Sequence, residues 1–536
     1  MKSPMPSPNP KPRLAFYHDG RHPLIYMYET PMSREQYEAA VDELVGTPVD
    51  TLMLCLGDGR TVLHESAVGE LWGHNVTTWP HLVFRRAHHN ARLAIESGND
   101  PLRLIIDRAR AKGLAIYPTL LVQQGRGPRE QDVRCSEFRF DHPHLEIGAK
   151  GNVDPASPAH TCLDFMHDEV RQERSALIDE VIDRYDIDGF ELQLNYFCQY
   201  FDPTELEAGR LVMTEWIRQV RTSLTRSGAD RHLVVRVPGD LEACHAAGLD
   251  VRAWIDESLV DVVVAQTFGG PELIDVNADV SGFVEAASGR DVKVMGCVQS
   301  LVDSDRQYQG PIETIRAAAC NLWSQGVDGL YLAHWFGNWP YEADFYEKLR
   351  EIVDPEVMAP KDKQYYVPTT TGRFANPDSD IGKALQLPAE LALDEPFEAQ
   401  WRTSDDLPRW REAGRVHQVL LRFRLESVTE DDIISFALNG RDLATEHVRR
   451  IDETYRMRAP RYRVGACYWF IFHLPPKNWP SAGIQRVTIT LERRAADVEP
   501  AMSVRDIEFE VRYLMGKAHR RDNNDADLGQ VNWGNL

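Results

Sequence analysis

Residues 188–196, DGFELQLNY, alternate apolar and polar side chains with the period of a β-strand. One face carries Phe190, Leu192, Leu194 and Tyr196, and the other carries Gly189, Glu191, Gln193 and Asn195. A strand with its polar face inward suits a closed barrel covered by helices, whose interior opens at the carboxyl ends of the strands. Because an interior carboxylate is costly unless it is paired or used, Glu191 is the first candidate for a catalytic group.

Glu191 has two interpretations. Inside a barrel, burial can raise the pKa of a carboxylic acid and make it a general acid or base. Alternatively, the Glu191 carboxylate forms a buried ion pair, and Arg236 on the next predicted strand is the expected partner. The position at the end of the fourth predicted strand favours the catalytic interpretation, because barrel active sites lie at the carboxyl ends of the strands.

The elements around this strand alternate between strand and helix from residue 13 to about residue 352. The predicted strands are residues 13–18, 50–57, 114–122, 188–195, 232–238, 260–268, 291–298 and 328–335. The predicted helices are residues 33–45, 100–113, 167–185, 204–227, 246–258, 277–288, 310–325 and 340–352. Eight strands, each followed by a helix, predict a (β/α)8 barrel over residues 13–354. A doubly wound open sheet is the alternative, but no Gly-x-Gly-x-x-Gly follows the first strand.

The remainder of the chain changes its period. Residues 355–385 are predicted as a linker, and residues 386–516 alternate with period two, which predicts an all-β sandwich. The aromatic residues of that domain are predicted to pack in its core, so a structural role of the domain is favoured over carbohydrate binding. Residues 1–12 and 517–536 are polar, and we expect disordered tails there.

Composition limits the possible partners. The formal net charge of −22 argues against binding to nucleic acid or to an anionic membrane surface. The sequence shows no secretory leader and no apolar run of membrane-spanning length, and its eight cysteines form no CxxC pair. These features predict a cytoplasmic protein with reduced thiols, and they leave the oligomeric state undetermined.

The segment YDIDGFELQLNYF, residues 185–197, resembles a strand of hypothetical glycosyl-hydrolase-like (β/α)8 proteins that are described as family-10-like. Four further pieces share the resemblance: residues 18–20, 99–114, 134–148 and 169–189. The resemblance implies a barrel with a C-terminal β-domain and a carbohydrate substrate. Two positions depart from it, since Gln193 replaces a second acid and Tyr196 replaces a basic residue. Compared with the family-18 chitinase strand, the catalytic position is Asn195.

The expected activity is therefore hydrolysis of a glycosidic bond with Glu191 as acid or base and no cofactor. Most glycosidases need a second carboxylate. Asp19, just past the first strand, is the preferred partner, and Asp58 and Asp240 are alternatives. All three also fit the role of turn residues. An acetamido group of the substrate is a further possible nucleophile.

Polar residues at other strand ends are predicted to line the sugar pocket, because amide, imidazole and guanidinium groups hydrogen-bond hydroxyls in fixed directions. They are His18, Gln123, Gln193, Asn195, Arg236, Gln266 and His334. Trp335 and Trp339 are candidate platforms for a sugar ring, with core packing as the alternative. The His-rich loop from His64 to His89 shows no metal-ligand spacing, so no metal site is predicted.

Two other functions stay open at this point. Gln193 and Asn195 favour a barrel that binds carbohydrate without cleaving it. The other is a sugar-acid lyase or isomerase, which a requirement for a divalent metal would favour over hydrolysis. If Glu191 is the acid or base, Glu191→Gln should lower turnover by orders of magnitude and change ligand affinity by no more than several-fold. Undiminished turnover would remove Glu191 from the mechanism.

Overall fold

The computed structural model describes residues 10–123, 125, 127–228, 230–267, 273–303, 309–371, 384–444, 448–454, 467–516, 524–525 and 529–530. The predicted tails fall mostly outside these residues. The exceptions are residues 10–12 and the short strands β21 (Asn524–Asp525) and β22 (Gly529–Gln530). The chain divides into two compact units. The first is Met1–Phe268, Asp279–Cys297 and Gln325–Val353, and the second is Gly269–Ala278, Val298–Ser324 and Asp354–Leu536.

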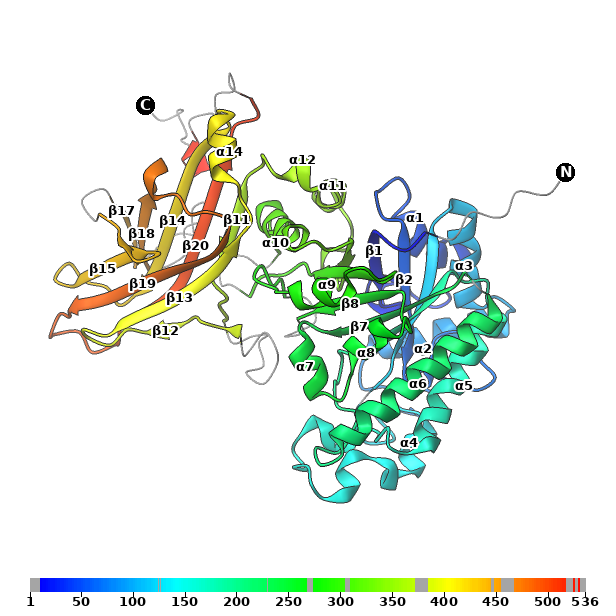
Figure 1. Cartoon of the computed structure of the whole chain (residues 1–536). Helices are drawn as coiled ribbons and strands as arrows, with labels where there is room; N and C mark the ends of the chain where they lie inside the picture. The colour runs from blue at the N-terminus through cyan, green and yellow to red at the C-terminus, as the bar shows by residue number, and fades with distance from the viewer. Residues whose placement is uncertain are drawn as a thin grey trace. The chain divides into compact units, whose positions relative to one another are not determined.

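The predicted barrel is confirmed. Its strands are β1 (Leu14–His18), β2 (Thr51–Asp58), β5 (Ala115–Leu121), β6 (Gly189–Gln193), β7 (His232–Pro238), β8 (Val262–Gln266), β9 (Lys293–Val298) and β10 (Gly329–Leu332). They follow one another in the sheet in sequence order, and β1 pairs in parallel with both β10 and β2, which closes the sheet (Figure 1). The short strands β3 (Thr61–Val62) and β4 (Glu70–Leu71) extend the sheet from the carboxyl end of β2.

The helices follow the strands as predicted, and two of their ends match the expected capping. Ser33 and Gln36 form a capping box before α1, and Gly113 ends α3 with a φ of 72°. The predicted connection at residues 58–99 holds β3, β4 and an additional helix, α2. The helices up to β10 are α1 (Arg34–Asp42), α2 (Leu82–Glu96), α3 (Pro101–Lys112), α4 (Glu137–Asp141), α5 (Asp168–Arg184), α6 (Leu206–Ser227), α7 (Leu241–Ala246), α8 (Val251–Asp256), α9 (Ser281–Ala287) and α10 (Ile312–Ser324). α11 (Ala343–Ile352) follows β10.

The alternation of β6 is as the sequence predicts, up to the end of the strand. Glu191 and Gln193 point into the barrel, where they contact side chains of neighbouring strands. Tyr196 was placed on the outer face, but its ring packs against the interior cluster. The reason is that β6 ends at Gln193, so the period of two does not extend to residue 196.

The second unit is built on two antiparallel sheets, as the prediction of a β-sandwich requires. One sheet has the order β11-β20-β14-β18-β17 with β12 beside β20, and the other has the order β13-β19-β15-β16. Their bounds are β11 (Lys363–Tyr366), β12 (Ala389–Glu390), β13 (Pro396–Thr403), β14 (Val416–Glu426), β15 (Ile433–Leu438), β16 (Arg441–Asp442), β17 (Arg449–Glu453), β18 (Cys467–His473), β19 (Gly483–Arg493) and β20 (Ser503–Tyr513). One apolar cluster contains residues of both sheets.

The segment predicted as a linker, residues 355–385, carries secondary structure of its own. It contains α12 (Pro355–Met358) and β11, which pairs with β20 from Lys363 to Tyr366. Residues 372–383 lie outside the described residues. The Asn439-Gly440 turn joins β15 and β16 with positive φ at both residues, as a tight hairpin requires.

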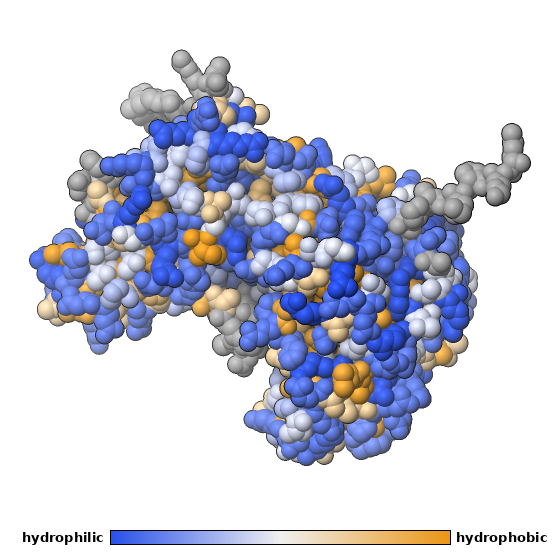
Figure 2. All heavy atoms as spheres, in the orientation of Figure 1, coloured by the Kyte–Doolittle hydropathy of each residue, from blue (hydrophilic) through white to orange (hydrophobic). Residues whose placement is uncertain are grey.

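Most of the surface on the face drawn in Figure 2 is hydrophilic, and apolar side chains appear there in small patches. Within the described residues, no helix combines the length and the apolar character that crossing a membrane requires.

Two buried histidines give the barrel a predictable response to acid. Burial lowers the pKa of His18 and of His64 to about 4. The unfolded chain binds these protons near pH 6.5, so the stabilisation is complete above that pH and is lost as the pH falls toward 4. We expect the free energy of unfolding, measured with urea, to decrease between pH 7 and pH 5.

His64→Phe should reduce this pH dependence by about 1.4 kcal/mol per pH unit between pH 6 and pH 4.5. His64 lies among apolar side chains, and its Nε2 has no hydrogen-bond partner in the described part of the chain. His144→Phe, at an exposed histidine, is the control and should leave the slope unchanged. An unaltered slope in His64→Phe would contradict the assignment.

Candidate active site

The centre of the barrel holds a buried ion pair between β6 and β7. The Glu191 Oε1 atom lies 3.0 Å from the Arg236 Nε atom, and the Tyr331 hydroxyl donates to Glu191 Oε2 at 3.0 Å. The Arg236 guanidinium lies between two rings, 4.3 Å from the centre of Tyr17 and 4.8 Å from that of Tyr331. The side chains of Glu191 and Arg236 are 0% and 1% exposed.

This geometry corresponds to the ion-pair interpretation of Glu191. Burial alone would lower the pKa of Arg236, but the Glu191 carboxylate and the surrounding phenols outweigh it and raise that pKa well above its usual value. The guanidinium therefore stays charged. The Glu191 carboxyl group is fully buried and occupied by Arg236 and Tyr331, so a substrate has no access to it. The catalytic role of Glu191 remains an untested prediction, and the geometry favours the ion pair.

The amides predicted to line the pocket contact one another and the backbone. Gln193 donates to Thr119 at 2.6 Å, and Asn195 donates to Gln266 at 2.8 Å. The Arg236 Nη1 atom is 3.5 Å from Gln266 Oε1, so these interior groups form one polar layer with the ion pair. Gln123 instead binds the backbone carbonyls of Leu163 and Gln199, and thereby connects two loops.

The candidates at the ends of β1 and β10 are also mostly buried. His18 Nδ1 accepts the Gly20 N–H at 3.0 Å. His334 has a φ of 54°, and its ring centre is 5.1 Å from that of Tyr17. Burial, reinforced by Arg236, lowers the pKa of His334 to about 3. Trp335 is fully buried against Phe345, which corresponds to the core-packing alternative.

Trp339, the other candidate platform, is half-buried and donates its indole N–H to Glu43 at 2.9 Å. The two tryptophans of this segment thus have different environments.

An exposed histidine and a buried aspartate meet just after β1. Asp19 Oδ1 accepts the backbone N–H groups of Arg21 and His22, each at 2.9 Å, and Asp19 Oδ2 is hydrogen-bonded to His22 Nδ1. The short π-helix at Arg21–Ile25 begins there and gives the backbone this geometry. The imidazole of His22 lies parallel to the ring of Phe336, with centres 4.5 Å apart and an interplanar angle of 7°.

The charge state of Asp19 follows from these contacts. Burial would raise its pKa, but the hydrogen bond from His22 and the nearby positive groups outweigh burial and hold that pKa well below its usual value. An ionised carboxylate only accepts hydrogen bonds, so the Nδ1 atom of His22 carries a proton. In the neutral imidazole, the Nε2 atom therefore has the free lone pair.

Two arginines and a second aspartate continue this cluster. The Arg21 guanidinium forms an ion pair with Asp58 at the end of β2, and the Trp72 indole donates to Asp58 at 3.1 Å. The Asp58 carboxylate raises the pKa of Arg134, a half-buried residue of the loop after β5. Asp58 is thus an ion-paired anchor, whereas Asp240, the other alternative acid, caps α7 by accepting the Ala243 N–H at 2.7 Å.

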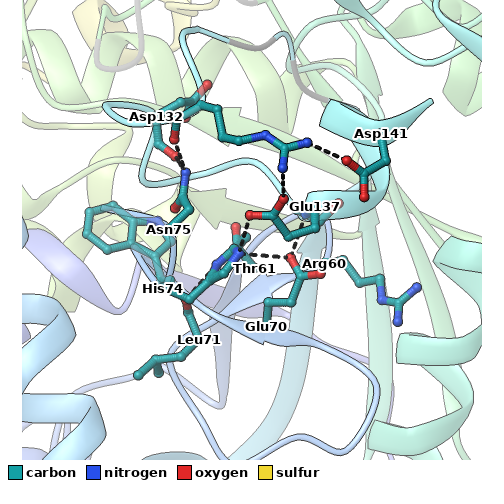
Figure 3. Close-up of polar contacts among 12 residues, drawn as sticks. Arg60, Thr61, Glu70, Leu71, His74, Asn75, Asp132, Glu137 and Asp141 are labelled. Carbon is teal, nitrogen blue, oxygen red and sulfur yellow. Dashed lines mark hydrogen bonds and ion pairs between the residues drawn. The ribbon is translucent and has the colours of Figure 1, made fainter. Parts of the chain in front are cut away.

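A second group of titratable side chains joins the long loops after β2 and β5 (Figure 3). The His74 Nε2 atom lies 3.2 Å from Glu137 Oε1 and 3.6 Å from Glu70 Oε2. Glu70 also accepts the Glu137 N–H at 2.9 Å, and Arg129 contacts both Glu137 and Asp141. Burial and the neighbouring Glu137 carboxylate raise the pKa of Glu70. These groups tie the two loops together.

Sequence reasoning missed several of these residues. Predictions based on strand ends and on the period of the strands do not reach four of them: Arg21, His22, Glu70 and Glu137. The spacing of Asp19 and His22, three residues apart after a strand, was a usable signal. The contact between Glu70 and Glu137 joins loops 67 residues apart, and no local pattern predicts it. Among the described residues, no group of three or more His, Cys, Asp or Glu side chains is arranged to hold a metal ion.

Among known proteins, the similarities of this chain are to solved structures. No family model and no curated protein matches the chain. Solved structures similar to it include the glycoside hydrolase domain of PgaB (BpsB) from Bordetella bronchiseptica, with 11% identity, a TM-score of 0.41, and coverage of 64% of this chain and 99% of that chain. The endo-β-1,4-mannanase from Thermotoga petrophila has 9% identity, a TM-score of 0.44, and coverage of 92% and 97%.

The α-L-fucosidase isoenzyme 2 from Paenibacillus thiaminolyticus has 11% identity, a TM-score of 0.42, and coverage of 81% of this chain and 71% of that chain. At these levels the matches carry no argument about activity. The assignment of the barrel rests on the strand pairing itself, and the likeness to family-10-like proteins stays a resemblance.

The ion pair at the centre of the barrel predicts a strong effect on stability. Glu191→Gln leaves the Arg236 charge buried without its partner, which should lower the free energy of unfolding by about 3–5 kcal/mol. Adding Arg236→Met removes the unpaired charge and should restore most of this loss. Urea unfolding at pH 7 measures both variants.

Glu96→Gln provides the matched control, since Glu96 pairs with Arg92 on the exposed surface of α2. That change should cost less than about 1 kcal/mol. A loss in Glu191→Gln as small as in this control would show that the buried pair does not hold the barrel interior together.

Proposed function

We propose that the mouth of the barrel binds a carbohydrate and hydrolyses a glycosidic bond in an oligo- or polysaccharide. The observation that carries the proposal is the exposed imidazole of His22, which Asp19 orients at the carboxyl end of β1. Active sites of (β/α)8 enzymes lie at this end of the strands. The resemblance of residues 185–197 to glycosyl-hydrolase-like barrels supports carbohydrate as the substrate class.

In this proposal Asp19 acts through His22. Asp19 was predicted as the second carboxylate of the reaction, but both of its oxygens accept hydrogen bonds from the turn that follows β1. Its role is to hold the proton of His22 on Nδ1, as the aspartate of a hydrolase triad does for its histidine. The His22 Nε2 atom then takes a proton from the attacking water as the water oxygen bonds to the anomeric carbon and the glycosidic C–O bond breaks. The imidazolium passes that proton on to the departing sugar oxygen, and stacking on Phe336 fixes the plane of the ring.

Residues beside His22 are proposed to bind the sugar. Tyr196 and Phe336 are half-buried and pack against the interior cluster of the barrel, so each ring has an apolar surface at the mouth. Arg134 is half-buried and supplies guanidinium donors near Asp58. Apolar ring faces together with directional donors are the groups that recognise the two kinds of surface of a sugar. Asn195 and Gln266 belong to the polar layer below.

A second candidate function is carbohydrate binding without cleavage. The specific observation in its favour is the state of β6, where Glu191 is sealed against Arg236 and the next two interior positions are amides. A barrel whose carboxylate on this strand is held in an ion pair keeps the hydrogen-bonding groups for a sugar but has no free acid there. The two candidates differ in whether reducing ends are released.

Substitutions of the Asp19–His22 pair test the proposal. His22→Gln should lower turnover by about 10²–10⁴-fold and change substrate affinity by no more than several-fold, because a general base is lost and the binding groups remain. Asp19→Asn should lower turnover as well, since the amide no longer holds the proton of His22 on Nδ1. Release of reducing ends from a panel of soluble polysaccharides is the measurement.

His144→Gln, at an exposed histidine of the loop after β5, is the control and should keep full activity. Turnover that survives in His22→Gln would remove His22 from the mechanism. Sugar binding by the wild-type protein without any release of reducing ends would favour the non-catalytic function instead.

A further inference from the structure

We propose that the second unit carries its own site for one neutral sugar ring, in a pocket formed by α10, α12, β11 and α14 (Leu407–Glu412). The cavity has a volume of about 200 Å³, and all of its lining residues belong to this unit. Figure 1 shows these elements in the second unit. The inference is independent of the activity proposed for the barrel.

The floor of the pocket is a rigid polar network around Asp405. The carboxylate is 3% exposed and accepts the Lys363 ammonium at 2.9 Å together with the hydroxyls of Tyr365 and Tyr513. Lys363 also donates to the backbone carbonyls of Ala359 and Lys361. Every donor of the ammonium has an acceptor, so the floor keeps its geometry whether or not a ligand is present.

The walls present two tryptophans among small polar groups. Trp323 at the end of α10 and Trp410 in α14 are both half-buried and both line the cavity. Ser324 and Ser404 lie in the same lining and bring hydroxyl groups. An indole face accepts the C–H face of a sugar ring, and hydroxyl and carboxylate groups accept and donate hydrogen bonds at its edge.

The charges of the pocket argue against an anionic ligand. Lys363 neutralises Asp405, and the Arg409 guanidinium is 3.1 Å from the Glu356 carboxylate. Asp406, the remaining carboxylate, accepts the Arg409 N–H at 3.1 Å as the N-cap of α14. Both cations of the lining are already paired, so an anionic ligand such as phosphate finds no uncompensated positive charge there. A polyhydroxylated ring of monosaccharide size fits the volume and the donor set.

The rim of the pocket can adjust to a ligand. Arg409 and Glu356 are both exposed, and such surface pairs contribute about 0–1 kcal/mol, so the pair opens at little cost. The Arg409 guanidinium lies over the Trp410 ring, 4.7 Å from its centre, so it covers that face until the pair opens and a sugar ring takes its place.

The test uses the full chain and four neutral probes: glucose, galactose, mannose and N-acetylglucosamine. Saturation-transfer NMR should detect at least one of them, with a Kd in the millimolar range. Trp410→Ala should raise that Kd at least about tenfold, since it removes a stacking surface. Ala359→Trp fills the cavity without removing a contact and should abolish binding, which keeps the test valid if Trp410→Ala folds poorly.

Trp479→Ala is the matched control, because Trp479 is a half-buried tryptophan of the same unit that does not line the pocket. It should bind as the wild type does, and so should His22→Gln. The proposal is overturned if no probe binds the wild type, if Ala359→Trp binds normally, or if inorganic phosphate competes with the sugar. Binding that Trp410→Ala and Ala359→Trp both leave unchanged would place the sugar elsewhere in the chain and reject this pocket alone.

Discussion

Closure of the parallel sheet is the constraint on which the first unit depends. β1 pairs with β10 on one side and with β2 on the other, so none of the eight strands is left as an open edge. Closure also forces the inward side chains of all eight strands into one narrow core, where each polar group must find a partner inside the barrel. The ion pair of Glu191 and Arg236, with the hydroxyl of Tyr331, is how this sequence meets that requirement.

The same requirement separates the interior of the barrel from its mouth. Within the strands, the amides of Gln193, Asn195 and Gln266 are used by other side chains. Beyond the strand ends, polar side chains no longer need hydrogen-bond partners inside the barrel. Exposed groups such as His22 therefore keep one side open to solvent. We therefore place the proposed chemistry at the first turn after β1 and assign a structural role to the carboxylate of β6.

The pKa values of the titratable groups differ between the interior and the mouth. In the interior, burial dominates and lowers the pKa of His18 and His334, so these imidazoles stay neutral at neutral pH. At the mouth, Asp19 has several positive neighbours, which hold its pKa low despite burial. The interior histidines are neutral, and the aspartate at the mouth is ionised. The ionised Asp19 accepts a hydrogen bond from His22 and thereby fixes its tautomer, which is the property that a general base needs.

The sequence by itself determined the order of elements, the barrel and the inward direction of Glu191, because the period of two and the helix caps are local properties of the chain. It also named Arg236 as the possible partner of Glu191. Only the tertiary structure shows that Arg236 pairs with Glu191, since that depends on whether the Arg236 side chain reaches it across adjacent strands. The contacts of His22 with Phe336, and of Glu70 with Glu137, join segments far apart in the chain. Such contacts are set by closure and loop packing, and no local pattern records them.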